Sequence, residues 1–426
     1  MVNRNYRPLD SSISVNLGSF IKRVLLPGLG LGLSMLTLSG RAQAQIQMVS
    51  PNGLAYTEPR SVAQFGGFTA FGGSQDGNDT NADGVGDDYR GGVYLYEWGN
   101  LRINYVPRGP EFMYAFLGTE VRLSNTWLAA TAPGYNVTAG TGESGAVLLA
   151  KKVNGSYGAL SYVVRDNRIP AHSTLAIAVS DTYLVIGAPN GLLSRGNPGG
   201  AVVFTYDAVR NAWGSPVVIT PSDGHAADSF GNSVSIDGNR IAIGAPNHDA
   251  DLSDSVAGSG RAYVFERSGS QWLQTLGYTS NDATPEGRYG EKVDISGNRL
   301  IVSAPFAAGI GLVQILERDA SSWRSRFIDH RSALSVAIQN DKAIVGLSQY
   351  PSGAHSGNRI RTYRLMGSTW SAYGGMVGKD IGDSFGEAVD IHSDQVAVTA
   401  RGFDYKGRMS VGAVYLENFW ATASGL

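Results

Sequence analysis

The feature that most constrains this chain is a unit of about four short strands that recurs seven times. In the clearest copy, the turn Asp237-Gly-Asn-Arg240 leads into the apolar strand Ile241-Ala-Ile243, and after a variable loop another strand begins at Gly260. One such unit cannot bury its own apolar face, so it must stack on its neighbours. A small-residue turn follows the second strand of every unit, at Phe71-Gly-Gly73, Thr131-Ala-Pro133, Gly187-Ala-Pro189, Gly244-Ala-Pro246, Ser303-Ala-Pro305, Gly346-Leu-Ser348 and Thr399-Ala-Arg401.

These repeats predict an all-β protein, a seven-bladed β-propeller with four-stranded blades. A linear solenoid is the alternative, but a closed ring removes the exposed strand edges that an open array would leave. The last unit is short, whereas residues 46–50 resemble the fourth strand of another unit, Val217-Val-Ile219. We therefore expect residues 46–50 to pair with the seventh blade and close the ring.

The first 44 residues have the pattern of a secretory signal peptide. Lys22 and Arg23 precede an apolar run over residues 24–38, and Ala42-Gln-Ala44 is a small-x-small cleavage site. We expect cleavage after Ala44 and a mature propeller over residues 45–426, without a membrane span. An uncleaved anchor is less favoured because the run is shorter than the ~20 residues that a span needs. The protein is thus expected outside the cell or in the periplasm and cell envelope.

Composition excludes several classes of function. The formal net charge is -2, so the basic field that a nucleic-acid partner usually requires is missing. The chain has no cysteine, which excludes disulfides, thiolate metal sites and cysteine nucleophiles. The six histidines are scattered, and no two have the spacing of metal ligands. We therefore expect that the protein is not an enzyme.

The repeat resembles a known family. Phe230-Gly231 followed by Gly244-Ala-Pro246 is similar to the FG-GAP repeat, the unit of integrin α-subunit propellers and of many bacterial secreted proteins. Tyr289-Gly290 and Phe385-Gly386 begin close variants. The resemblance implies a β-propeller with a role in binding or cell adhesion.

One loop has the spacing of a calcium site. The segment from Asp79 to Asp87 places oxygen side chains at relative positions 1, 3, 5 and 9 and a glycine at position 6, which suits Ca²⁺ better than Mg²⁺. The predicted ligands are Asp79, Asn81, Asp83, the Val85 carbonyl and Asp87. The loop differs from the family pattern, because integrin-type repeats carry the cation between the first and second strands. A solvated acidic loop is the alternative.

The loops between second and third strands vary in length and should all emerge at one face of the ring. Variable loops on a rigid scaffold are where binding usually evolves. Trp213, Trp272, Trp323 and Trp370 begin fourth strands instead, so we expect them to pack between blades. The candidate ligand-binding residues in the loops are Tyr135, His248, Tyr350, His355, Phe403, Tyr405 and Arg408.

The leading prediction is a secreted, adhesion-type propeller that recognises an extracellular protein or glycan through this face. A Ca²⁺ ion would stiffen the first unit's loop. One alternative is an extracellular hydrolase or lyase that uses the propeller channel, where carboxylates or histidines would then gather. Another is a structural module of the cell envelope. The sequence does not distinguish their partners or oligomeric states.

Overall fold

The computed structural model describes most of the chain. The described residues are 46–49, 59–73, 89–107, 110–112, 114–135, 145–166, 168–169, 176–189, 198–249, 258–320, 322–347, 359–378, 381–404 and 411–418. Their helical segments are three short 3-10 turns, η1 (Pro110–Phe112), η2 (Ala307–Gly309) and η3 (Ile381–Asp383). No helix within these ranges has the length and apolarity to cross a membrane.

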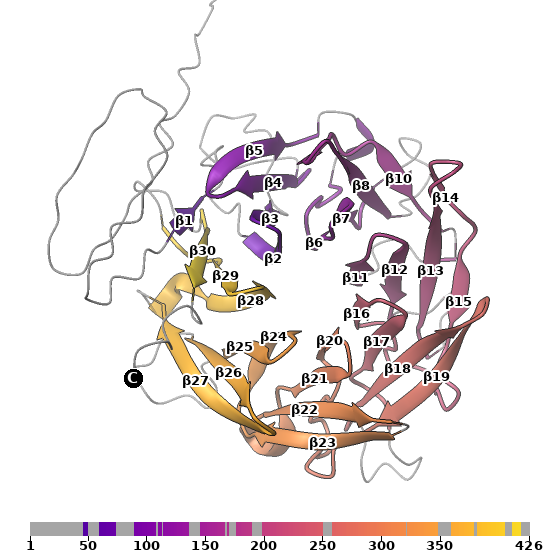
Figure 1. Cartoon of the computed structure of the whole chain (residues 1–426), viewed down its shortest axis with the longest axis vertical. Coiled ribbons are helices and arrows are strands. Elements are labelled where there is room, and N and C mark those ends of the chain that lie inside the picture. Colours follow the sequence, from indigo (N-terminus) through magenta and orange to yellow (C-terminus); the bar gives the residue numbers. More distant parts are fainter. Residues whose placement is uncertain are drawn as a thin grey trace, which may run out of the picture.

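Seven antiparallel sheets are arranged radially in a ring, which confirms the predicted seven-bladed propeller (Figure 1). The strands of blades 1 to 3 are β2 (Pro59–Phe65), β3 (Phe68–Gly73), β4 (Gly92–Glu97) and β5 (Asn100–Tyr105); β6 (Val121–Leu123), β7 (Trp127–Ala132), β8 (Ala146–Val153), β9 (Ser156–Tyr157) and β10 (Tyr162–Val164); and β11 (Ala176–Val179), β12 (Tyr183–Ala188), β13 (Gly200–Asp207), β14 (Ala212–Trp213) and β15 (Val217–Ile219). In blades 2 and 3 the fourth strand is divided into two short pieces that pair with the same neighbour.

The remaining four blades have four strands each. They are β16 (Ser233–Asp237), β17 (Arg240–Ala245), β18 (Arg261–Ser268) and β19 (Gln271–Tyr278); β20 (Lys292–Ser296), β21 (Arg299–Ala304), β22 (Leu312–Asp319) and β23 (Ser322–Asp329); β24 (Ala333–Gln339), β25 (Lys342–Leu347), β26 (Arg359–Met366) and β27 (Thr369–Val377); and β28 (Phe385–His392), β29 (Gln395–Ala400), β30 (Ala413–Asn418) and β1 (Ile46–Met48). The first strand of every blade faces the centre of the ring (Figure 1).

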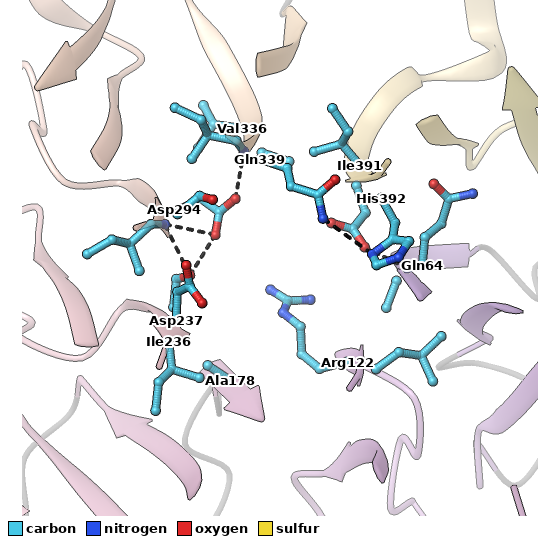
Figure 2. A pocket seen from close by; sticks show the side chains of 18 of the residues that line it. Gln64, Arg122, Ala178, Ile236, Asp237, Asp294, Val336, Gln339, Ile391 and His392 are labelled. Carbon is cyan, nitrogen blue, oxygen red and sulfur yellow. Dashed lines mark hydrogen bonds between the residues drawn. The ribbon is translucent and has the colours of Figure 1, made fainter. Parts of the chain in front are cut away.

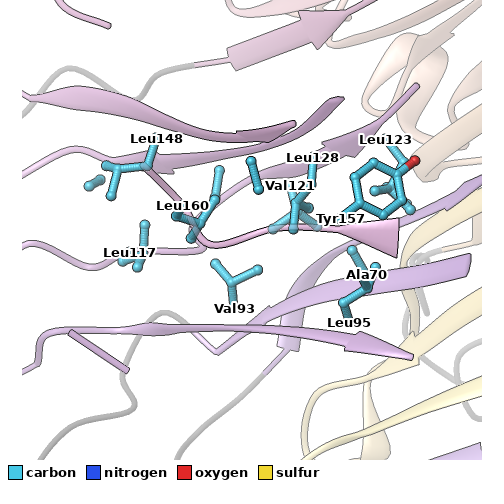
Figure 3. Close-up of a cluster of buried hydrophobic side chains, with 14 of the residues drawn as sticks. Ala70, Val93, Leu95, Leu117, Val121, Leu123, Leu128, Leu148, Tyr157 and Leu160 are labelled. Carbon is cyan, nitrogen blue, oxygen red and sulfur yellow. The ribbon is translucent and has the colours of Figure 1, made fainter. Parts of the chain in front are cut away.

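The hydrophobic core lies between blades. Successive side chains of a strand point to opposite faces of its sheet, and both faces of each blade are covered by neighbours. In β18, Tyr263 and Phe265 pack with blade 3, whereas Ala262 and Val264 pack with blade 5. Over the described residues, buried apolar side chains form seven such clusters, one at each blade interface. Figure 3 shows the cluster between blades 1 and 2, where Val93 and Leu95 meet Leu128 and Leu148.

The tryptophans that begin fourth strands reach the preceding blade, as predicted. The Trp213 ring lies 5.1 Å from the Trp127 ring of blade 2, and the Trp272 ring lies 5.2 Å from Tyr183 of blade 3. The Trp370 indole N–H donates to Glu317 of blade 5 at 3.2 Å. These aromatic rings therefore stabilise the stacking of blades.

The N-terminal strand closes the ring, as expected. β1 pairs antiparallel with β30, with Ile46 opposite Leu416 and Met48 opposite Val414. Met48 is buried in a cluster that joins blades 7 and 1, and the Tyr96 hydroxyl of blade 1 donates to the Val49 carbonyl at 2.9 Å. The seventh blade is therefore built from both ends of the described chain.

Pairs of glycines set the close approach of four blades to the blades that follow them. A Cβ added at Gly187 in blade 3 would lie 2.0 Å from the carbonyl oxygen of Gly231, which opens blade 4 with a φ of +98°. The same contact joins Gly72 with Gly118 (1.8 Å), Gly244 with Gly290 (1.9 Å) and Gly346 with Gly386 (1.8 Å). Only glycine on both sides allows this approach without a shift of the backbone.

The other three blades carry a hydroxyl residue at this position, and the blades that follow them lack the partner glycine. The Thr131 Oγ1 accepts the Glu120 N–H at 2.9 Å, and the Thr399 Oγ1 accepts the Ala388 N–H at 2.9 Å. The Ser303 Oγ accepts the Lys292 N–H at 3.2 Å. The variation of the Gly-Ala-Pro turn between units therefore follows the partner across each interface.

Candidate functional site

The loops between second and third strands emerge at the same end of the ring as the connections between blades, and we call this end the loop face. Hydrogen bonds hold the two kinds of segment together. The Leu117 N–H donates to the backbone carbonyl of Arg90 at 2.8 Å. In the same way, the Phe230 N–H donates to the Pro198 carbonyl and the Tyr289 N–H to the Ser259 carbonyl. The bases of these loops are therefore fixed to the propeller frame.

The connections themselves have a repeated backbone pattern. Every second residue before the blade has a positive φ, in the left-handed region. In blade 2 these residues are Tyr114 (+59°), Phe116 (+52°) and Gly118 (+86°), the glycine that precedes the first strand. The segments 227–231 and 286–290 repeat this alternation. Non-glycine residues in this region cost free energy, and they cluster at functional sites.

An exposed aromatic cluster lies on the loop face at blades 1 and 2. The rings of Tyr89 and Tyr114 are stacked with centroids 6.1 Å apart, and Phe116 lies 6.0 Å from Tyr89. Tyr89 is 37% exposed and Tyr114 is 49% exposed. Rigid aromatic side chains of this kind are typical anchors of binding surfaces. Neither tyrosine is among the residues predicted from the sequence. Tyr114 lies in a connection between blades rather than in a loop between second and third strands, and Tyr89 lies in such a loop but has no local pattern that marks it.

Three of the predicted ligand-binding residues lie within the described chain. Tyr135 is half-buried against Phe112, with ring centroids 5.0 Å apart, and Phe403 packs edge-on against Tyr415 at 6.4 Å. His248 is only 3% exposed and its Nδ1 lies 2.8 Å from the Asp228 Oδ2. All three sit on the loop face but pack onto its frame. The other candidates (Tyr350, His355, Tyr405 and Arg408), the loop ligands Asp79 to Asp87 and the signal peptide lie outside the described residues.

The seven first strands enclose a central channel with a cavity volume of about 350 Å³ (Figure 2). Seven equivalent positions in the middle of these strands face it. Four of them are polar, Arg122, Ser235, Asp294 and Asp390, and the three others are Ala63, Ala178 and Ala337. Figure 2 shows the Arg122 guanidinium directed into the channel.

The two channel carboxylates bridge neighbouring blades. Asp294 in β20 accepts the Ile338 N–H of β24 at 2.7 Å and the Ser235 hydroxyl of β16 at 2.6 Å. Asp390 in β28 accepts the Gln64 N–H of β2 at 2.6 Å. Because first strands of adjacent blades do not form a common sheet, these bonds satisfy backbone donors that would otherwise face the channel.

The environment of the channel shifts the titration of both carboxyls. Burial among the surrounding strands raises the pKa of Asp294 to about 6, although the hydrogen bonds from Ser235 and Ile338 and the charge of Arg122 oppose the shift. Burial raises the pKa of Asp390 to about 7, with a further upward contribution from the Asp294 charge. Both carboxyls are only partly buried at the channel, but the ring of protein around them removes most of their solvation.

A sequence signal for these residues exists. Asp294 stands in Val293-Asp-Ile295 and Asp390 in Val389-Asp-Ile391, so each is a single carboxylate inside an apolar first strand. Ser235 has the same place in Val234-Ser-Ile236. A charged residue in an otherwise apolar strand at the same position of several repeats indicates a shared internal surface.

The comparison with known families gives one match. Residues 213–265 match the FG-GAP repeat. This chain is a seven-bladed β-propeller that contains an FG-GAP repeat. None of the curated proteins with which the sequence was compared matches it. The matched segment runs from β14 and β15, the outer strand of blade 3, through the third strand of blade 4.

The FG-GAP repeat is therefore offset from the structural blade by one strand. A repeat that begins on the outer strand of one blade and continues into the next ties the two blades together covalently. The same offset explains why β1 precedes blade 1 in sequence but completes blade 7. The fold of an FG-GAP propeller is consistent with a binding or adhesion-type module.

Proposed function

We propose that this FG-GAP propeller is a secreted binding module that recognises an extracellular protein or glycan through its loop face. The observation that supports this proposal is the stacked pair Tyr89 and Tyr114, which is exposed on a frame fixed by hydrogen bonds. Aromatic rings bury a large area at low conformational cost, and they stack on sugars as well as on protein side chains. The chain would be exported by its signal peptide and would have no catalytic role.

The predicted calcium loop adjoins this pair in sequence. Tyr89 follows Asp87, the last proposed ligand, by two residues. A Ca²⁺ ion bound by Asp79, Asn81, Asp83, Val85 and Asp87 would restrict the backbone that leads into Tyr89. We therefore propose that Ca²⁺ strengthens partner binding by fixing the aromatic surface rather than by contacting the partner.

A binding array tests the proposal. The mature protein is applied to glycans and extracellular-matrix proteins, with Ca²⁺ and with EDTA, and hits are expected to weaken in EDTA. The double variant Tyr89→Ala/Tyr114→Ala should lose these hits. Trp98→Ala is the matched control, because Trp98 is 64% exposed but lies in the turn between β4 and β5, at the opposite end of the ring. Hits that survive the double variant as well as they survive the control would contradict the proposal.

A second candidate function is hydrolysis or elimination in the channel, and the two carboxyls favour it. Groups whose pKa is raised toward 6 and 7 can act as general acids or bases near neutral pH. Both already accept backbone N–H groups, which accounts for them as structural residues. Turnover of a panel of polysaccharides that disappears in Asp390→Asn, with the fold retained, would support the enzyme over the binding module.

A further inference from the structure

Three side chains of types that ligate metals meet on the loop face of blade 4. His225 and Asp228 lie in the connection between β15 and β16, and His248 follows β17. One ligand atom of each residue lies within 4.8 Å of the others. Asp228 is 2% exposed and His248 is 3% exposed, whereas His225 is exposed to solvent.

Hydrogen bonds hold this cluster in place. The Asp228 Oδ2 lies 2.8 Å from the His248 Nδ1 and accepts the His225 backbone N–H at 2.7 Å. The Tyr263 hydroxyl lies 3.5 Å from the same His248 nitrogen and donates to Asp223 at 3.0 Å. Metal sites are commonly supported by such a second layer of polar groups, which orients the ligands.

Blades 2 and 5 show that the fold does not need these residues, although blade 7 keeps a buried aspartate, Asp383, at the position of Asp228. In blade 2 the three positions are occupied by Phe112, Ala115 and Tyr135, and in blade 5 by Thr284, Gly287 and Ala307. The backbone is the same in each case. The Asn247 N–H donates to the Asp228 carbonyl at 3.1 Å, and the Gly134 and Phe306 N–H groups make the equivalent bonds to Ala115 and Gly287.

The ring contact is preserved as well. The His225 and His248 rings lie 5.9 Å apart, where Phe112 and Tyr135 lie 5.0 Å apart in blade 2. An apolar contact that suffices in blade 2 is thus replaced in blade 4 by two imidazoles and a buried carboxylate. The carboxylate alone does not set blade 4 apart, because blade 7 buries Asp383 at the position of Asp228. Blade 7 has Phe403 at the position of His248, so the pair of imidazoles beside the carboxylate is what distinguishes blade 4 from blades 2, 5 and 7.

We propose that His225, Asp228 and His248 bind a divalent transition-metal ion, with Zn²⁺ the best fit. Imidazole nitrogen and carboxylate oxygen are the ligands that Zn²⁺ takes at about 2.0–2.2 Å. Two such ligands of a tetrahedral ion lie roughly 3.4 Å apart, so the 2.8 Å between Asp228 and His248 must widen slightly when the ion replaces their shared proton. Rotation of the exposed His225 side chain allows the ion to enter.

Three protein ligands leave a fourth coordination position for water or for a donor from a partner. The ion would also cross-link the loop after β17 to the connection before β16 and so stiffen the loop face at blade 4. This site is separate from the proposed calcium loop and from the aromatic pair in blades 1 and 2. A negative result for Zn²⁺ binding would therefore leave the proposed function unaffected, and the reverse also holds.

Isothermal titration of the untagged mature protein with ZnCl₂, with CaCl₂ in excess, tests the proposal. We expect one Zn²⁺ per chain. The triple variant His225→Phe/Asp228→Ala/His248→Tyr, which copies the blade 2 set, should weaken binding by more than about 100-fold, beyond the loss caused by removing a supporting residue. His330→Gln, at an exposed histidine elsewhere, should bind as the wild type does.

Two further measurements test the coordination of the metal and the folding of the triple variant. The visible absorption of the Co²⁺-substituted protein should have the intensity of a four-coordinate site and should be lost in the triple variant. Circular dichroism and metal-free melting of that variant should match the wild type; if it fails to fold, the exposed single change His225→Phe replaces it, with a weakening of at least about 10-fold expected. Wild-type protein that binds no Zn²⁺, or a folded variant that binds it equally well, would overturn the proposal.

Discussion

The glycine pairs predict that a single methyl group at a blade interface destabilises the ring. In the variant Gly187→Ala the new Cβ would lie 2.0 Å from the Gly231 carbonyl oxygen and 2.9 Å from its carbonyl carbon. Both contacts are to backbone, so no side chain can rotate away. The interface must open by roughly 1 Å or more, and overpacking of this kind typically costs about 1–3 kcal/mol.

A smaller effect opposes this cost. Alanine restricts the unfolded chain more than glycine does, which stabilises the folded state by about 0.4–1 kcal/mol where the backbone allows it. We therefore expect a net loss of about 1–2 kcal/mol in the free energy of unfolding, measured from urea denaturation followed by tryptophan fluorescence. The equivalent variants Gly244→Ala and Gly346→Ala should behave alike, since their contacts are as close.

Gly382→Ala is the matched control, because a Cβ there meets no atom within 4 Å and its φ is not in the left-handed region. Its free energy of unfolding should be unchanged or slightly higher. Unfolding of Gly187→Ala and Gly382→Ala at the same urea concentration with the same slope would contradict this expectation. That result would mean that neighbouring blades do not depend on this close approach.

Three further predictions follow from the fold. Deletion of residues 45–52 removes β1, including the buried Met48, which alone contributes roughly 1.5–3 kcal/mol; the truncated chain should fail to fold or unfold at a lower temperature, and equal melting of both chains would be evidence against closure by β1. The free energy of unfolding should fall as pH rises from 4 to 7, because the raised pKa values of Asp294 and Asp390 make the folded state bind more protons than the unfolded state over this range. Asp294→Asn/Asp390→Asn should flatten this slope, which amounts to at most roughly 3–4 kcal/mol for each carboxyl. Ser303→Ala should cost about 1 kcal/mol through the lost hydrogen bond to the Lys292 N–H, as judged by thermal melting, and an unchanged melting temperature would contradict that bond.

Much of the propeller could be predicted because its signals are local. Each strand pair, tight turn and Gly-Ala-Pro segment is contained in a few tens of residues, so the number of blades and the closure by residues 46–48 followed from counting. The position of Trp272 at the head of a fourth strand likewise indicated packing between blades, which its contact with Tyr183 confirms.

The candidate sites could not be predicted in the same way, because they depend on contacts between units. His225 and His248 are 23 residues apart, with no ligand spacing in the sequence. Tertiary hydrogen bonds, such as that from the Asn247 N–H to the Asp228 carbonyl, bring their segments together. The exchange of Gly187 for Thr131 or Ser303 has no explanation within one unit. It follows a rule only when each residue is compared with the blade across the interface.

The pairing of β1 with β30 has a consequence for how the molecule is made. β1 precedes all other strands of the ring in the chain and β30 follows them, so six blades can assemble before the two strands of blade 7 meet. A chain cut short during translation or clipped before folding is left with an unpaired strand at the gap. Such an edge invites pairing with other chains and attack by proteases. Blade 7 is therefore complete only in a chain that carries both the first and the last strand of the ring.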